Sequence, residues 1–186
     1  MTSDEAVVAV IAALAAEGVP YMLTGSLASN LYGIPRSTND ADFVLQIDAG
    51  GLGALRARLE PALRWEARLS FETVTSTTRQ ILEVPGIGFR IELFFLTDDP
   101  HDAERFARRR RVPALGREVY VPSAEDVVIT KLRWSRQGQR NKDRDDVRAV
   151  VAASGDRLDW DYVHRWCDVH GTRALLDEIR RSIPTT

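Results

Sequence analysis

Two aspartates open an apolar run in the first quarter of the chain, and this junction restricts how the chain can fold. Asp40 and Asp42 lead into residues 43–47, whose branched and aromatic side chains predict a β-strand. Alternate side chains of a strand share a face, so the two carboxylates point the same way. Paired acids at this spacing can hold divalent cations through their oxygen atoms. The alternative is a strand start whose acids face solvent.

Two further short apolar runs extend this arrangement. Residues 21–24 predict a strand that ends at Gly25 and Ser26, and residues 89–96 predict a strand with one acid, Glu92. Glycine lets a phosphate approach the backbone, and the Ser26 hydroxyl and the N–H groups of a following helix can bind it. Taken singly, Gly25–Ser26 is only a turn, and Glu92 can point to water. Together, the three pieces suggest metal-dependent nucleotidyl transfer.

The first two thirds of the chain alternate between helix and strand patterns. Thr2 and Glu5 form a capping-box pattern before the first helix. Residues 85–88 predict a hairpin between two strands, and residues 64–78 give no clear pattern. The expected helices are 4–17, 26–32, 52–63 and 101–110, and the remaining expected strands are 79–84 and 117–121.

After residue 122 only helices are expected, at 123–136, 142–153, 160–169 and 173–180. The chain therefore predicts an α/β (α+β) fold, in which a mixed sheet with flanking helices is followed by a helical C-terminal part. We place a catalytic domain at residues 1–121 and a helical domain that closes over the nucleotide at residues 122–186. Trp134, Trp160 and Trp166 are expected in the core of the helical domain.

Charge is distributed unevenly along the 186 residues, although the net charge is only −2. Residues 104–148 contain 13 basic and 7 acidic side chains, including the run Arg108–Arg111. Such a segment favours a polyanionic partner, although a solubilising surface is the alternative. A single cysteine, Cys167, excludes an intrachain disulfide, and no apolar run approaches membrane-spanning length. With no cationic leader at the N-terminus, we expect a soluble cytoplasmic protein without a membrane partner.

The separated motifs Leu23-Thr24-Gly25-Ser26, Asp40-Ala41-Asp42 and Ile91-Glu92-Leu93 resemble those of the DNA polymerase β-like nucleotidyltransferase superfamily. The string from Tyr32 to Asp42 is similar to the AbiEii-type toxin branch, as are Lys131-Leu132 and the K-D-x-x-D motif at residues 142–146. The third acid departs from the commoner pattern, because it is glutamate rather than aspartate.

This resemblance implies transfer of a nucleoside monophosphate from an NTP to an acceptor hydroxyl, with one or two Mg²⁺ ions as cofactor. The expected acceptor is RNA, such as a tRNA end, with Arg108–Arg111 as the contact surface, and a cognate antitoxin is a possible partner. The alternatives are a small-molecule or protein acceptor, or a degenerate binding module without activity. The residues with implied roles are Asp40, Asp42 and Glu92 for the metal and catalysis; Lys131 for catalysis and the triphosphate; and Gly25, Ser26, Arg36, Thr38, Asp143 and Asp146 for the nucleotide.

Overall fold

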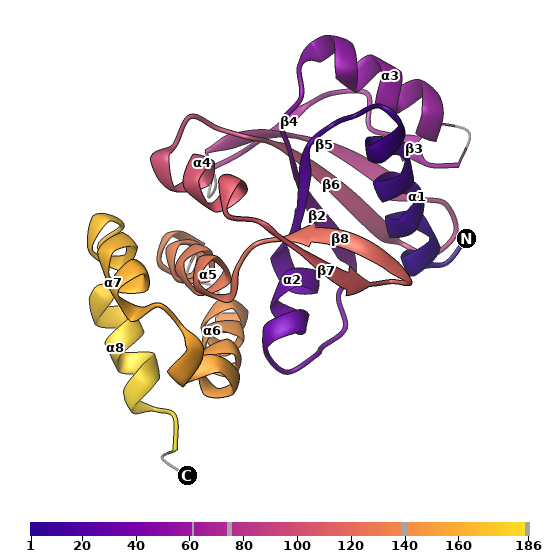
Figure 1. The fold of residues 1–186 in the computed structure, drawn as a ribbon. Helices are drawn as coiled ribbons and strands as arrows, with labels where there is room; N and C mark the ends of the chain where they lie inside the picture. The colour runs from indigo at the N-terminus through magenta and orange to yellow at the C-terminus, as the bar shows by residue number, and fades with distance from the viewer. Residues whose placement is uncertain (61, 74–75, 139–140, 185–186) are drawn as a thin grey trace.

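The computed structural model describes residues 1–60, 62–73, 76–138 and 141–184 (Figure 1). Its centre is a six-stranded mixed sheet with the order β1-β2-β6-β5-β3, in which β4 also pairs with β5. β2 and β6 run parallel, and the other pairs are antiparallel. The strands are β1 (Tyr21–Thr24), β2 (Asp40–Leu45), β3 (Arg64–Trp65), β4 (Ser70–Glu72), β5 (Thr77–Val84) and β6 (Phe89–Phe95).

One face of this sheet carries the main hydrophobic core. Alternation in β2 and β6 sends Phe43, Leu45, Ile91 and Leu93 to this face, where they are fully buried. The elements that cover them, drawn together in Figure 1, are α1 (Ser3–Ala16), α3 (Ala49–Leu59) and the hairpin of β7 (Arg110–Ala114) and β8 (Arg117–Val121). The predicted capping box of α1 is present, since Thr2 and Glu5 bond each other's backbone N–H groups.

The opposite face of the sheet is only partly covered. Met22, Val44 and Phe94 pack there against Phe106 of α4 (Pro100–Ala107). Two residues earlier in β2 and β6, at Asp42 and Glu92, the same face carries acidic side chains instead of apolar ones. The acids therefore lie beside a small apolar cluster rather than inside the main core.

A second core holds the helical part together. It is built by α5 (Ala124–Gly138), α6 (Asn141–Ser154), α7 (Trp160–Val169) and α8 (Arg173–Arg181), and by Leu158, which follows the 3-10 turn η1 (Gly155–Arg157). α2 (Gly25–Tyr32) joins this core through Ala28, and the Tyr32 hydroxyl donates to the Pro122 carbonyl at 2.8 Å. The two parts are thus packed through α2, and the division at residue 121 stays a prediction.

The expected α/β fold with a mixed sheet and flanking helices is confirmed, with one element type wrong. The predicted helix at 101–110 ends at Ala107, and Arg110 begins β7, which pairs with β8 from Arg110↔Val121 to Ala114↔Arg117. The ambiguous residues 64–78 contribute β3 and β4, while 74–75 lie outside the described residues. In the described part of the chain, no helix combines the length and apolar character required to cross a bilayer.

Candidate active site

Three carboxylates meet on the partly covered face of the sheet. The parallel register places Asp42 of β2 directly opposite Glu92 of β6, and Asp40 lies two residues before Asp42 on the same face. All three line one open cleft, together with Ser26, Lys131 and Lys142. Acids far apart in the chain are therefore neighbours because two strands that flank a long intervening segment pair in parallel.

Gly25 lies directly against Asp42. Its φ of +66° is in the left-handed region, which glycine adopts at little cost. A Cβ atom at this position would lie 1.9 Å from Oδ2 of Asp42 and 2.8 Å from its Cγ. The absence of a side chain at Gly25 is thus what lets the turn and the carboxylate share this space, and the buried Ser26 follows at the start of α2.

The carboxylates oppose one another electrostatically. Burial, followed by the negative charges of Asp40 and Glu92, raises the pKa of Asp42 to about 7. Burial also raises the pKa of Glu92, and the charge of Arg79 offsets only part of that effect. A bound cation would relieve this repulsion, because it favours the charged form of each acid.

Two of the acids have partners that fix their orientation. The Thr38 hydroxyl donates to Oδ1 of Asp40 at 2.6 Å. Glu92 accepts from Nη1 of Arg79 on β5 at 2.5 Å, and the same nitrogen lies 3.1 Å from Glu72 on β4. The Glu92 carboxylate is therefore already ion-paired with an arginine, unlike the carboxylates of Asp40 and Asp42.

Arg36 joins the sheet part to the helical part. Its Nε and Nη2 donate to the two carboxylate oxygens of Asp146 at 2.9 and 3.0 Å, and Nη2 also donates to the Ser26 hydroxyl at 2.9 Å. The side chain of Asn30 bonds both the N–H and the carbonyl of Arg36. The prediction brought Arg36 to the triphosphate; in the structure its guanidinium lies beside Ser26 and is held by Asp146.

Lys131 is almost completely buried, with 3% of its surface exposed, between two carboxylates of α6. Its Nζ donates to Asp143 Oδ1 at 2.9 Å and lies 2.8 Å from Asp146 Oδ2. Burial alone would raise the pKa of Asp146, but hydrogen bonds from Arg36 and Lys131 lower it overall. Ser26, Arg36, Asp146, Lys131 and Asp143 thus form one connected network, and the alternative of a solvated charged face does not apply to Asp143 or Asp146.

The run Arg108–Arg111 lies elsewhere. Arg108 packs over the ring of Tyr162 at 3.9 Å, and Arg109 packs over Phe106 at 4.3 Å. Arg110 and Arg111 are exposed on β7, and none of the four is among the described residues that line the acidic cleft. The predicted contact surface therefore lies outside the cleft, and its role in binding RNA stays a prediction.

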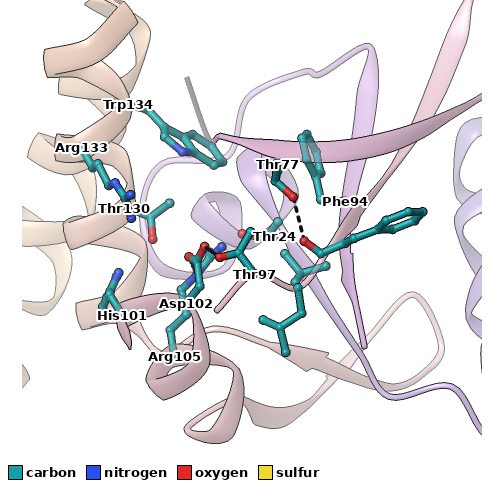
Figure 2. Close-up of a pocket in the computed structure, with 13 residues that line it drawn as sticks. Thr24, Thr77, Phe94, Thr97, His101, Asp102, Arg105, Thr130, Arg133 and Trp134 are labelled. Carbon is teal, nitrogen blue, oxygen red and sulfur yellow. Dashed lines mark hydrogen bonds and ion pairs between the residues drawn. The ribbon is translucent and has the colours of Figure 1, made fainter. Parts of the chain in front are cut away.

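Sequence reasoning missed several residues of the cleft, including Arg79, Lys142 and Trp134. Trp134 was expected in the helical core; instead it is half-buried and lines both the acidic cleft and a second pocket. Figure 2 shows this pocket, with Thr24, Thr77 and Phe94 from the sheet, Thr130, Arg133 and Trp134 from α5, and His101, Asp102 and Arg105 from α4. The predicted hairpin at 85–88 could have located Arg79, because it pairs β5 with β6 and so brings Arg79 close to Glu92.

The donor set of the cleft fits a hard cation such as Mg²⁺, because Asp40, Asp42 and Glu92 supply only oxygen atoms. The pKa of Asp42 is raised first by burial and then by the charges of Asp40 and Glu92, and a cation between the acids would counter both effects. Within the described ranges, no three His, Cys, Asp or Glu side chains are already arranged to hold a metal ion together. The arrangement favours Asp40 and Asp42 as the first ligands, since Glu92 is turned to Arg79.

Comparison with known families gives one match that spans nearly the whole chain. The profile of the family described as "Nucleotidyl transferase AbiEii toxin, Type IV TA system" matches residues 10–183. The match covers the sheet, the acidic cleft and the helical part together. No curated protein matches the chain in a sequence comparison.

Solved structures share the fold at low sequence identity. The crystal structure of ANT(2")-Ia in complex with adenylyl-2"-tobramycin is 16% identical, with a TM-score of 0.65 over 94% of this chain and 99% of that one. An antigenic nucleotidyltransferase-like protein from Paracoccidioides brasiliensis is 18% identical, with a TM-score of 0.56 over 100% and 96%. The lincosamide antibiotic adenylyltransferase LnuA is 13% identical, with a TM-score of 0.51 over 80% and 96%.

Proposed function

Because this chain belongs to the nucleotidyl transferase AbiEii toxin family of type IV toxin–antitoxin systems, we propose that it transfers a nucleoside monophosphate from an NTP to a hydroxyl group of RNA. The observation that carries this proposal is the position of Asp42, which lies opposite Glu92 in register and against Gly25. This arrangement brings a cation-binding acid, a second acid and a phosphate-binding turn into one cleft. A cognate antitoxin is the partner that membership of this family suggests.

Asp40 and Asp42 are the residues that would hold Mg²⁺, with Glu92 as a further ligand or as the base. When bound, the ion would offset negative charge on the phosphate and on the attacking and leaving oxygens. Thr38 supports this role, because its hydrogen bond fixes one oxygen of Asp40 and leaves the other available.

The reaction exchanges one P–O bond for another. The acceptor hydroxyl oxygen attacks the α-phosphorus, the bond from the α-phosphorus to the bridging oxygen breaks, and pyrophosphate leaves. Glu92 accepts the hydroxyl proton, because burial raises its pKa and it lies opposite Asp42. Arg79 holds this carboxylate in place and limits the increase in its pKa.

The triphosphate lies between the two parts of the molecule. Gly25 permits close approach to the backbone, and the N-terminus of α2 presents N–H groups and the Ser26 hydroxyl. Arg36 and Lys131 provide positive charge, and Asp143 and Asp146 position them. Arg36 and Lys131 already bind Asp143 and Asp146. The triphosphate oxygens therefore bind these two cations alongside the carboxylates or in their place.

The decisive experiment offers each α-labelled NTP with Mg²⁺ to total RNA, an aminoglycoside, a lincosamide and cell lysate. Asp42→Asn should reduce labelling about 1,000-fold or more, because a metal ligand contributes several kcal/mol to the transition state. Asp161→Asn removes the same charge from an exposed position at the start of α7 and should label like wild type.

The labelled product distinguishes the alternatives. Label on RNA supports the proposed acceptor, and label only on a small molecule or a protein replaces it. Calorimetry that detects NTP binding without labelling of any acceptor would identify a binding module instead. Equal labelling by the two variants would remove Asp42 from the mechanism.

A further inference from the structure

Arg79 lies in the wall of the acidic cleft, where two acids hold it at once. Its Nη1 donates to Oε2 of Glu92 at 2.5 Å and lies 3.1 Å from Oε2 of Glu72. Its Nε donates to the Ser70 hydroxyl at 3.3 Å, and its Cζ lies 5.7 Å from the centre of the Phe94 ring. One nitrogen atom thus bridges two carboxylates, in the way that a cation shared by two acids does.

The sheet fixes this contact. β5 pairs with β6 so that Arg79 lies directly opposite Phe94, two residues after Glu92. Arg79 and Glu92 are therefore diagonal neighbours on one face of an antiparallel pair, within reach of a long side chain. Only 23% of the Arg79 side chain and 9% of the Glu92 side chain are exposed. Because salt screens a partly buried ion pair less than a surface pair, the contact persists in solution.

The two aspartates of the cleft have no such partner. In the part of the chain that the structure describes, the salt bridges around the cleft involve Glu92, Asp143 and Asp146 but neither Asp40 nor Asp42. Nor do three acids in that part converge to hold one metal ion. The cleft is therefore divided into a pair of aspartates without a cation and a glutamate that already has one.

This division limits how many metal ions the cleft can hold. A second Mg²⁺ would need a Glu92 oxygen as a ligand at about 2.0–2.1 Å, in a nearly octahedral arrangement. Oε2 of Glu92 already accepts from Arg79, whose guanidinium keeps its positive charge at any physiological pH. A metal ion on Glu92 would therefore have to displace the arginine and lie beside its charge.

We propose that Arg79 is a positioning residue that takes the place of a second metal ion, so that the cleft binds a single Mg²⁺ through Asp40 and Asp42. This inference rests on the proposed nucleotidyl transfer and makes Glu92 the base rather than a metal ligand. Arg79 holds Oε2, and Oε1 receives the proton of the acceptor hydroxyl. Arg79 keeps its own protons throughout.

The test counts metal ions in full-length protein with Mn²⁺, which takes the same oxygen ligands as Mg²⁺. The α,β-methylene analogues of the four NTPs are added, because they cannot transfer their nucleotide. Native mass spectrometry gives the number of ions. Electron paramagnetic resonance separates a lone Mn²⁺ from a spin-coupled pair, since paired ions in such sites lie about 3.5–4 Å apart. Wild type should bind one Mn²⁺ and give the spectrum of a lone ion.

Arg79→Gln should bind two Mn²⁺ ions and give the spectrum of a coupled pair, because it frees the Glu92 carboxylate. Arg79→Lys keeps the positive charge and should return the count to one. A coupled pair in wild type, or a single ion in Arg79→Gln, would overturn the inference.

The matched control is Arg90→Gln. Arg90 lines the same cleft from an exposed position on β6, and within the described ranges it forms no salt bridge. The variant removes the same charge without touching the ion pair and should still bind one Mn²⁺. A second ion in this control would show that net charge, rather than the contact with Glu92, decides the count.

Arg79 also bonds β4, so a loss of folding is covered separately. Glu72→Gln removes the contact of Arg79 with β4 but leaves Arg79 on Glu92, and it should bind one Mn²⁺. The count in wild type tests the inference even if Arg79→Gln does not fold. If wild type labels an acceptor but holds a coupled pair, the role of Arg79 fails while nucleotidyl transfer stands. If wild type holds one ion and labels no acceptor, the proposed function fails and the role of Arg79 as a substitute cation stands.

Discussion

Gly25 occupies a position at which any side chain would displace Asp42. Gly25→Ala should lower the free energy of unfolding by about 1–2 kcal/mol through its left-handed backbone. The same change should abolish nucleotidyl transfer, because the new Cβ would lie 1.9 Å from the Asp42 carboxylate. Chemical denaturation and labelling of the acceptor measure the two effects separately.

Gly18→Ala is the control, because Gly18 has a φ of +64° and no atom within 4 Å of an added Cβ. It should lower stability by the backbone contribution alone, about 1–2 kcal/mol, and leave the activity of the folded protein intact. An active Gly25→Ala, or equal loss of activity in both variants, would contradict the role given to Gly25.

At the scale of elements, α4, α5 and α7 meet around His170. Burial, together with the positive charges of His101 and Arg133, lowers the pKa of His170 to about 4, while Asp99 and Asp102 act in the opposite direction. Because an unfolded histidine titrates near 6.5, the unfolded chain takes up a proton first as the pH falls. The stability contributed by a neutral His170 should be complete above about pH 6.5 and should decrease as the pH falls toward 4.

Urea denaturation of wild type and His170→Gln at pH 7.5, 6, 5 and 4 measures this contribution. The difference between the two proteins should change steadily between pH 6.5 and 4 and be constant above that range. Parallel curves would show that the three-helix junction does not depend on a neutral His170.

The same scale shows where sequence reasoning failed. The β7 strand was missed because Arg108–Arg111 and Pro113 hide the alternation of Val112 and Ala114, and only pairing with β8 settles the conformation. Trp134 was placed in the core on its residue type, but the apolar face of α5 that packs in the helical core is formed by Val128, Ile129 and Leu132, and Trp134 lies at the cleft instead. Helices with strong periodicity and capping signals, such as α1 and α7, were predicted almost to the residue.

At the scale of the whole molecule, Asp146 joins the sheet part to the helical part. It binds Arg36 and Lys131 with only 8% of its side chain exposed. Asp146→Ala would leave both cations without this partner and should lower the free energy of unfolding by about 3–5 kcal/mol. It should also raise the KM for NTP, because Arg36 and Lys131 lose their positions.

Asp145→Ala is the matched control one residue away. Asp145 is 70% exposed on its side chain and pairs only with Arg148 among the described residues, at 2.8 Å. Its removal should change stability by less than about 0.5 kcal/mol. Similar melting temperatures for the two variants would show that the connected network does not hold the parts together.

The candidate site was predictable in outline because its motifs combine residue type with strand position. Asp40, Asp42 and Glu92 were placed correctly on one face, since alternation in two strands decides it. Their partners were not predictable, because the Arg36–Asp146 bond joins positions 110 residues apart and depends on how α6 packs on α2. The burial of Lys131 was not predictable for the same reason, because it depends on how α6 packs against α5.

The parallel pairing of β2 with β6 determines which parts of the cleft can vary in sequence and length. The spacing of Asp42 and Glu92 is set by that ladder, whereas residues 46–88 between the two strands form α3 and the outer strands β3, β4 and β5 of the same sheet. Within this segment, β4 and the start of β5 bring Glu72 and Arg79 to the rim of the cleft. Insertions or exchanges around residues 60–76 would therefore reshape the rim of the cleft while the β2–β6 ladder keeps Asp42 opposite Glu92.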